Sequence, residues 1–430
     1  MKPEELSEQL IGWRRDFHQY PEQGFLEIRT ASKVAGVLEK LGYELALGKE
    51  VMAEESCMGK PGEEETKQHL EWALENGTDT RYVEYFSEGY TGIVATLRTA
   101  QPGPTIAYRV DMDALPIHES EAADHVPNQA GFRSAAAGTM HACGHDSHTA
   151  IGLGLALRLA ENKDQLSGTI KLIFQPAEEG TRGAKSMAEA GVVDNVDYFI
   201  ASHIGTGVPH QHFVAASNGF LATSKLNITF KGVAAHAGAK PQEGKNALLA
   251  AASAALNMHA ITRHSDGSSR VNVGELHAGS GRNIIPDHAM LIAETRGETS
   301  EINQYVKEQV QSIVDGAAKM YQLDAKVEVA GEALNCDCSL GVAEILKQCA
   351  ESHPKIDGAL LESSDSSGSE DATYFMDRVQ RRGGQATYCI FGTELAAGHH
   401  NEKFDIHEDT LLPAVEILFQ SAKKIGRISE

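Results

Sequence analysis

The fold class follows from residues 141–180, which read HACGHDSHTAIGLGLALRLAENKDQLSGTIKLIFQPAEEG. An apolar helical segment at 149–160 leads to a buried-type strand at 168–174, and an acidic turn closes the stretch. Similar strand patterns lie on either side of it, at 92–98, 105–110 and 196–202. Because strands alternate with helices, the pattern predicts a mainly parallel α/β sheet.

The texture of the sequence changes near Gly219. Residues 219–330 combine two helical patterns with several strands, which suits a small α+β domain inserted into a larger one. We therefore expect an α/β domain made of residues 1–218 and 331–430, interrupted by an inserted domain at 219–330. A serine-rich stretch at 363–369 predicts a loop.

Composition excludes several classes of function. The chain has 430 residues, with 38 basic and 60 acidic side chains and a formal charge of −22. So acidic a protein is a poor general binder of nucleic acid or of anionic membranes. Six cysteines are scattered without the spacing of a disulfide framework, which indicates reduced thiols. With no apolar run near the ~20 residues of a spanning helix and no signal-peptide core, we expect a cytoplasmic protein.

The densest group of ligand-type side chains lies between Met140 and His148. These nine residues contain Cys143, His145 and His148, together with His141 and Asp146. Cysteine and histidine two positions apart, just before a helix, can be directed at one cation of the zinc, cobalt or manganese type. The alternative, a buried cysteine with surface histidines, explains a single residue better than it explains this group.

Further candidate residues follow the predicted strands. In an open parallel sheet, sites form at the carboxyl ends of the strands. The side chains at those ends are Asp111 and Asp113, Glu178 and Glu179, and His203, with His399 and His400 later in the chain. Adjacent Glu178 and Glu179 can point different ways, so one can bind metal while the other faces substrate as a base. An exposed acidic turn is the alternative. Their convergence predicts one metal centre with one or two ions.

Six motifs make a resemblance specific. They are RRDFHQYPE (Arg14–Glu22), DMDALP (Asp111–Pro116), HACGHDSH (His141–His148), QPAEE (Gln175–Glu179), NIIP (Asn283–Pro286) and GSED (Gly368–Asp371). Through them, nearly the whole chain resembles the metal-dependent amidohydrolase and peptidase family of hippurate hydrolases, plant auxin-conjugate hydrolases, aminoacylases and glutamate carboxypeptidase. Within this family it resembles bacterial aminobenzoyl-glutamate hydrolases, which carry a comparable acidic insertion after the second helix, here residues 50–86.

The resemblance implies roles for individual residues of the α/β domain. It implies two divalent ions per protomer, Mn²⁺ or Zn²⁺, bound by Cys143, His145, Glu179, His203 and His400. Glu178 matches the general base, and Asp111 and Asp113 match groups that orient the ligands, with Asp113 also counted among the catalytic residues. His400 is preferred to His399 because HNEKFD resembles the family's His-Ser-Pro-x-Phe pattern with histidine leading, although Asn401 and Glu402 replace Ser-Pro.

The inserted domain resembles the family's lid and dimerisation domain. Its GVAAHAG segment places His236 where the family uses a histidine to stabilise the oxyanion, often across the dimer. Asn283 and Arg296 match residues that hold the substrate's carboxylate. The resemblance therefore implies a homodimer, and the alternative is a hetero-oligomer that contains a homologous partner chain.

The implied reaction is hydrolysis of the amide bond of an N-acyl amino acid. The first candidate substrate is p-aminobenzoyl-glutamate, which would give p-aminobenzoate and glutamate; indole-acetyl-aspartate and hippurate-type amides are the alternatives. A weakly active binding component of a hetero-oligomeric hydrolase is the non-enzyme alternative, which intact Glu178 and Glu179 disfavour. The insertion at 50–86 either shapes substrate or partner contacts or is a solvated excursion.

Overall fold

A computed structural model describes residues 1–364 and 368–427 and divides the chain into two compact units. The first unit comprises residues 1–218, 336–364 and 372–427, and the second comprises 219–335 and 368–371. Residues 365–367 of the serine-rich stretch predicted as a loop lie outside the described residues. Within the described ranges, no helix combines the length and apolar character needed to span a membrane.

The expected boundary at residue 330 falls inside a strand of the second unit. Strand β12 (Asp324–Ala333) pairs antiparallel with β7 (Ala222–Lys231), so the second unit continues to Asn335. The polar alternation of β12 resembles that of its neighbours, and only its pairing shows where it belongs.

Eight strands of the described chain form the sheet of the first unit, in the order β1-β2-β4-β3-β5-β14-β6-β13. Their bounds are β1 (Glu44–Leu47), β2 (Ile93–Arg98), β4 (Ser167–Gln175), β3 (Gln101–Asp111), β5 (Tyr198–Ile204), β14 (Gln385–Phe391), β6 (His212–Ser217) and β13 (Gly358–Ser363). The pairs β4–β3, β3–β5 and β5–β14 are parallel, so four neighbouring strands run the same way. The predicted mainly parallel α/β sheet is confirmed.

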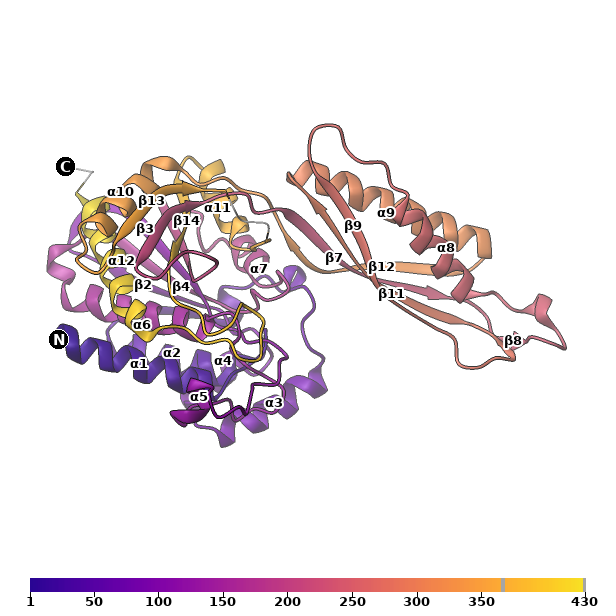
Figure 1. The fold of residues 1–430 in the computed structure, drawn as a ribbon, viewed down its shortest axis with the longest axis horizontal. Coiled ribbons are helices and arrows are strands. Elements are labelled where there is room, and N and C mark those ends of the chain that lie inside the picture. Colours follow the sequence, from indigo (N-terminus) through magenta and orange to yellow (C-terminus); the bar gives the residue numbers. More distant parts are fainter. Residues whose placement is uncertain (365–367, 428–430) are drawn as a thin grey trace. The chain divides into compact units, whose positions relative to one another are not determined.

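Helices cover both faces of this sheet (Figure 1). On one face lie α6 (His145–Glu161), α12 (Leu411–Gly426) and α10 (Leu340–Glu351), with α1 (Pro3–Gln19) and α2 (Ile28–Lys40) packed on α6. Helices α7 (Ala184–Glu189) and α11 (Thr373–Arg381) pack together and contact β5 and β14 through α11. Because both faces are covered, the strand segments that approach the site are apolar and buried, as in β14.

Helix α6 carries the Cys-Gly-His segment into the core. Its N-cap is Gly144, whose φ of 96° is open to glycine at little cost. A Cβ at Gly144 would also lie 2.7 Å from Ile204 Cγ2. Every residue from 145 to 157 is buried, because α6 packs on the sheet and against helices α1 and α12. The helix starts four residues before the Thr149 start expected from the apolar pattern, so His145 sits in its first turn.

The acidic insertion at 50–86 forms short elements around one helix. Helix α3 (Glu63–Glu75) packs on α2, and α4 (Val83–Phe86) follows. His69 Nε2 lies 2.9 Å from the buried carboxylate of Glu22, at Oε1. This contact ties the insertion to the start of α2, where Glu22 accepts backbone N–H groups.

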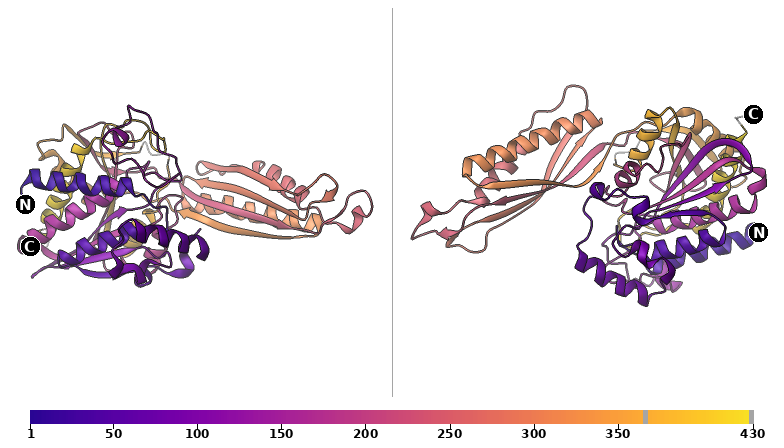
Figure 2. Two further views of the ribbon diagram at one scale, coloured as in Figure 1. Left: turned by 90° about the horizontal axis from the view of Figure 1, so that it is seen from below. Right: turned by 180° about the vertical axis from the view of Figure 1, so that it is seen from behind.

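The second unit is a two-layer α+β structure. Its antiparallel sheet has the order β12-β7-β11-β9, with β11 (His288–Gly297) and β9 (Ser269–Ala278) joining the strands already given. Helices α8 (Ala247–His259) and α9 (Ser300–Tyr321) lie side by side on one face of it (Figures 1 and 2). Alternate residues of β11 are buried beneath them, including Leu291 and Ala293. The two-residue strands β8 (Ala235–His236) and β10 (Ile284–Ile285) pair separately.

Candidate metal centre and active site

The candidate residues of the first unit gather where its four parallel strands end. Asp111 ends β3, and Asp113 follows two residues later. Glu178 and Glu179 follow β4, His203 is the next-to-last residue of β5, and the loop after β14 carries His399 and His400. Cys143 joins them from the turn before α6. Side chains from five separate segments thus meet at one edge of the sheet, as expected for a parallel α/β sheet.

A strained turn sets the direction of the two glutamates. Ala177 has a φ of 51°, which is uncommon for a residue with a Cβ. Its N–H donates to Glu27 Oε1 over 2.8 Å. The next two N–H groups, those of Glu178 and Glu179, donate to the two oxygens of Asp113 over 3.0 and 2.9 Å. Asp113 therefore orients the turn that carries both glutamates, and Glu27 anchors the strained residue before it.

Hydrogen bonds at Nδ1 prepare two histidines as ligands. His203 Nδ1 lies 2.8 Å from the carbonyl of Ile204, so Nδ1 carries the proton and Nε2 keeps a lone pair. His145 Nδ1 faces Asp113 Oδ1 at 3.3 Å, and its Nε2 is buried without a hydrogen-bond partner among the described residues. A metal-bound histidine donates from its other nitrogen in this way. His145 and His203 both direct Nε2 into the site.

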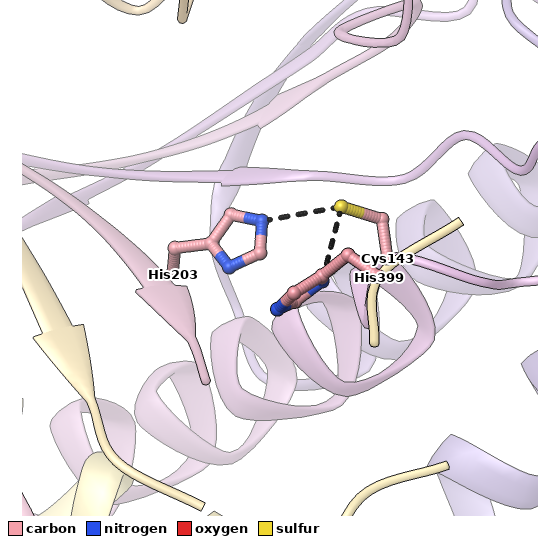
Figure 3. Close-up of side chains that lie close together, drawn as sticks. All are labelled: Cys143, His203 and His399. Carbon is pink, nitrogen blue, oxygen red and sulfur yellow. Dashed lines mark hydrogen bonds between the residues drawn. The ribbon is translucent and has the colours of Figure 1, made fainter. Parts of the chain in front are cut away.

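Two neighbouring histidines have the opposite arrangement. His148 Nε2 accepts the N–H of Ile204 over 3.0 Å, and its Nδ1 lies 2.6 Å from Asp111 Oδ1. His399 Nε2 accepts the N–H of Thr206 over 3.0 Å, so Nδ1 carries the proton of the neutral ring. That Nδ1 lies 3.6 Å from Cys143 Sγ (Figure 3). In each neutral ring, Nδ1 therefore donates a hydrogen bond within the site. The lone pair on Nε2 accepts a backbone N–H, so neither ring has a lone pair left for a metal ion.

Cys143 lies at the centre of the group. Its Sγ is 3.5 Å from His203 Nε2 (Figure 3). The ligand atoms of Cys143, Glu179 and His400 also lie within 4.8 Å of one another, with His400 Nε2 3.5 Å from Glu179 Oε1. His400 has a φ of 62°, a second strained residue at this edge. Because Sγ lies near His203 Nε2 and also near the ligand atoms of Glu179 and His400, Cys143 is a candidate for a donor shared between two ions.

The electrostatics fit a divalent cation. Burial and the charge of Glu179 raise the pKa of the Cys143 thiol to about 12. Burial opposes the charged form of His145, but Asp111 and Asp113 outweigh it and raise the pKa of that ring. Glu179 Oε1 is buried without a hydrogen-bond partner in the described part of the chain. A thiol, imidazoles and a carboxylate directed at one another form a donor set suited to zinc- or manganese-type ions.

A buried network beneath the site was not found by reading the sequence. Arg14 donates to Asp146 Oδ2 over 2.9 Å and to Asp405 Oδ1 over 2.5 Å, and its side chain is fully buried. His18 bridges Asp146 and Glu119, at 2.8 and 2.9 Å. Since Asp146 directly follows His145, this network fixes the first turn of α6. The Arg14–Glu22 motif gave the signal, but only the fold shows its partners.

The candidate residues of the second unit are not gathered in the same way. His236 in β8 is exposed, and its Nδ1 accepts the N–H groups of Gly238 and Ala239 over 3.1 and 3.0 Å, which leaves the proton of the neutral ring on Nε2. The Asn283 carbonyl accepts the N–H of Ala237 over 2.9 Å, so Asn283 lies beside His236. Arg296 pairs with Glu294 near the far end of β11.

The separation of Asn283 and Arg296 is set by β11. Asn283 lies just before β10, near the His288 end of β11. Arg296 is the next-to-last residue of β11, at the opposite end. Eight residues of extended strand span about 26 Å. Within one chain, therefore, Asn283 and Arg296 do not contact the same carboxylate, although they were predicted to act together. Sequence motifs alone gave no indication of this distance.

A family model matches the chain over most of its length. The model, described as peptidase family M20/M25/M40, matches residues 107–424. This range contains Asp111, Cys143, Glu178, His203 and His400.

Individual relatives match nearly from end to end. One of them, a component of the p-aminobenzoyl-glutamate hydrolase of Escherichia coli, is 53% identical over 97% of this chain and 96% of its own. The indole-3-acetyl-aspartic acid hydrolase of Enterobacter agglomerans is 51% identical with the same coverage, 97% and 96%. The crystal structure of an aminobenzoyl-glutamate utilization protein from Klebsiella pneumoniae is 47% identical, with a TM-score of 0.86, over 98% of this chain and 97% of that one.

Proposed function

We propose, because the chain belongs to the peptidase family M20/M25/M40, that it hydrolyses the amide bond between an aromatic acyl group and an acidic amino acid. Membership in this family and the amidohydrolase relatives confirm the predicted hydrolase class. The observation that carries the proposal is the placement of Glu178 and Glu179 on one strained turn, opposite Nε2 of His145 and the thiol of Cys143.

Glu178 is proposed as the general base. Its Oε2 lies 3.9 Å from His145 Nε2, so the carboxylate borders the group of ligand atoms without a close contact to that nitrogen. The bond from its N–H to Asp113 fixes the start of the side chain. From this position Glu178 can take a proton from the attacking water and later deliver it to the amine nitrogen that leaves. The products are the free aromatic acid and the free amino acid.

Cys143, His145, Glu179, His203 and His400 are the proposed ligands of two divalent ions. Bound ions would polarise the scissile carbonyl. They would also lower the pKa of a bound water molecule, so that hydroxide is available at neutral pH. The roles of the surrounding side chains follow from their hydrogen bonds. Asp113 orients His145, and His399 donates a hydrogen bond to the Cys143 sulfur, which favours its thiolate form. Manganese and zinc both suit this mixed set of donors.

The substrate proposal rests on the relatives. The two full-length relatives described above are named for p-aminobenzoyl-glutamate and for indole-3-acetyl-aspartic acid. Both compounds join a flat aromatic acyl group to an amino acid that carries two carboxylates. We place p-aminobenzoyl-glutamate first, because the 47% identical crystal structure also carries an aminobenzoyl-glutamate name. The aspartate conjugate is the second candidate, supported by an identity of 51%.

A partner chain is part of the proposal. The Escherichia coli relative is named as one of the subunits of its hydrolase, which favours an assembly with a second type of chain; a homodimer is the alternative. His236 is proposed as the donor that stabilises the oxyanion, since the proton of its neutral ring lies on Nε2. A cytoplasmic location also remains a proposal, consistent with an acidic chain and scattered thiols.

The test is release of p-aminobenzoate from p-aminobenzoyl-glutamate by the purified single chain. The chain is stripped with a chelator and reloaded with manganese or with zinc, and indole-acetyl-aspartate and hippurate are run in parallel. We expect metal-dependent turnover with the highest kcat/KM for p-aminobenzoyl-glutamate. Faster turnover of the aspartate conjugate would replace the first substrate by the second. Absence of turnover on all three substrates, with metal bound and after addition of a homologous second chain, would overturn the proposal.

A further inference from the structure

A second group of metal-ligand side chains lies outside the candidate active site. His210, His407 and Asp409 place three donor atoms within 4.8 Å of one another. His210 Nε2 lies 3.5 Å from Asp409 Oδ1, and His407 Nδ1 lies 2.5 Å from the same oxygen. The two imidazole rings have centroids 4.9 Å apart. Two imidazoles and one carboxylate are a common donor set for zinc-type ions.

We propose that His210, His407 and Asp409 form an additional divalent-cation site of the zinc type, separate from the ligands around Cys143. Nitrogen and oxygen ligands at about 2.0–2.1 Å from a tetrahedral ion lie about 3.3–3.4 Å apart. The 3.5 Å between His210 Nε2 and Asp409 Oδ1 fits that spacing, and it exceeds the usual 2.9–3.0 Å of an N–H···O hydrogen bond. Only His407 must move away from Asp409, and its side chain is 53% exposed.

The ring of His210 presents one nitrogen to this group. Its Nε2 faces Asp409, whereas its Nδ1 is buried and has no hydrogen-bond partner in the described ranges. Nε2 is therefore the ligand atom that His210 offers to a cation. The strongly acidic chain adds a field that attracts cations.

The site joins two loops that also meet at the active site. The loop after β5 donates from Thr206 N–H to His399 Nε2 and carries His210 four residues later. The loop after β14 folds back on itself, with Leu395 paired to Ile406 in an isolated bridge. His399 and His400 lie in the part of the loop that this bridge closes, and His407 directly follows the bridge residue Ile406. A cation bound by His210, His407 and Asp409 would therefore tie together the two loops that position the active-site histidines.

The experiment counts metal ions per chain. Wild-type protein and His210→Gln/His407→Gln protein are stripped and then dialysed against buffered micromolar free zinc, and zinc is measured by elemental analysis. We expect wild type to hold one more zinc per chain than the double variant. His277→Gln is the matched control, because exposed His277 faces a single carboxylate oxygen among the described residues, on Glu275, at 2.8 Å. It should hold the same zinc as wild type.

A second background separates the two sites. A Cys143→Ser chain lacks one of the proposed ligands at the active site. If His210→Gln/His407→Gln is added to that chain, the zinc that remains bound should fall by one ion. Zinc should also slow amide hydrogen exchange across residues 392–407 in wild type and not in the double variant. The single variant His407→Gln alters an exposed side chain and serves if the double variant fails to fold. Equal zinc content in all chains, or a third ion bound only at millimolar zinc, would overturn the site.

Discussion

The two units differ in how close together they place their candidate residues. In the first, parallel strands β3, β4, β5 and β14 end at one edge, and residues up to 289 positions apart in sequence, Asp111 to His400, meet there. In the second, antiparallel β11 sends Asn283 and Arg296 to opposite ends of a ten-residue strand. Motifs at the ends of parallel strands therefore imply proximity. Motifs on either side of one strand imply separation.

The difference extends to hydrogen bonding. In His203 and His399, next to Cys143, one ring nitrogen is committed to a backbone partner, so the state of the other nitrogen in the neutral ring follows. His236 accepts backbone N–H groups at Nδ1 and is exposed. Contacts within the first unit therefore fix its rings in the buried part of the site, whereas the ring of His236 lies in an exposed segment.

Removal of Cys143 should have the largest effect. In Cys143→Ser, we expect metal affinity to fall by more than about 100-fold, beyond the 10–100-fold cost of losing a group that only orients a ligand. Since burial and Glu179 raise the pKa of the thiol to about 12, metal binding by wild type must also displace its proton. Calorimetry in buffers of different ionisation enthalpy measures both effects. Cys57→Ser, at a half-buried thiol in the insertion, is the control. Unchanged affinity in Cys143→Ser would contradict the ligand assignment.

His236→Gln tests the second unit. We expect kcat to fall about 10²–10³-fold, the usual cost of one oxyanion donor, while metal content stays the same. Arg296→Gln, at the other end of β11, should instead raise KM with a small change in kcat. Steady-state kinetics separates the two. Equal effects of both variants on KM alone would show that His236 does not act on the reacting carbonyl.

The buried His18 predicts a stability change with pH. Burial lowers the pKa of His18, but its bonds to Asp146 and Glu119 outweigh burial and raise it from 6.5 to about 9. The native state then binds a proton that the unfolded state releases. This stabilisation is complete below pH 6.5 and is lost as pH rises through about 9.

The His18 contribution is about 3 kcal/mol, from about 1.4 kcal/mol per unit of pKa. Urea unfolding across this window should show wild type losing about that much more free energy than His18→Gln. His277→Gln, at an exposed ring, should follow wild type. If His18→Gln retained the full pH dependence, another group would carry it.

The smallest effect separates the adjacent histidines. In His399→Asn the Cys143 sulfur loses a hydrogen-bond donor, so we expect a 10–100-fold loss of metal affinity with the number of ions unchanged. In His400→Asn the number of bound ions itself should fall. Elemental analysis at fixed free metal distinguishes them. Loss of an ion from His399→Asn alone would reverse the assignment.

Much of the first unit could be predicted because its strands are apolar runs and its motifs lie at their ends. Glu178, Glu179 and His203 follow such runs directly, so the sheet brings them together as expected. The loop after β14 has no such regularity. Sequence alone could not show that the N–H of Thr206 donates to Nε2 of His399.

Other features depend on contacts between distant segments. Arg14 reaches Asp146 and Asp405, which are 132 and 391 positions away. Glu27 reaches Ala177, 150 positions away, and holds it at positive φ. Neither residue has a local pattern that reveals its partner. The distance between Asn283 and Arg296 likewise required the register of β11.

The most direct test compares Glu178→Gln with wild type at equal metal content. Both proteins are loaded with manganese, their ions are counted, and p-aminobenzoate release is measured under single-turnover conditions. We predict unchanged metal content and a rate lowered by about 10²–10⁴-fold, the range for loss of a general base. A Glu178→Gln chain that keeps its metal and hydrolyses substrate at the wild-type rate would contradict the assignment of Glu178 and the ligand residues around Cys143 as the hydrolytic site.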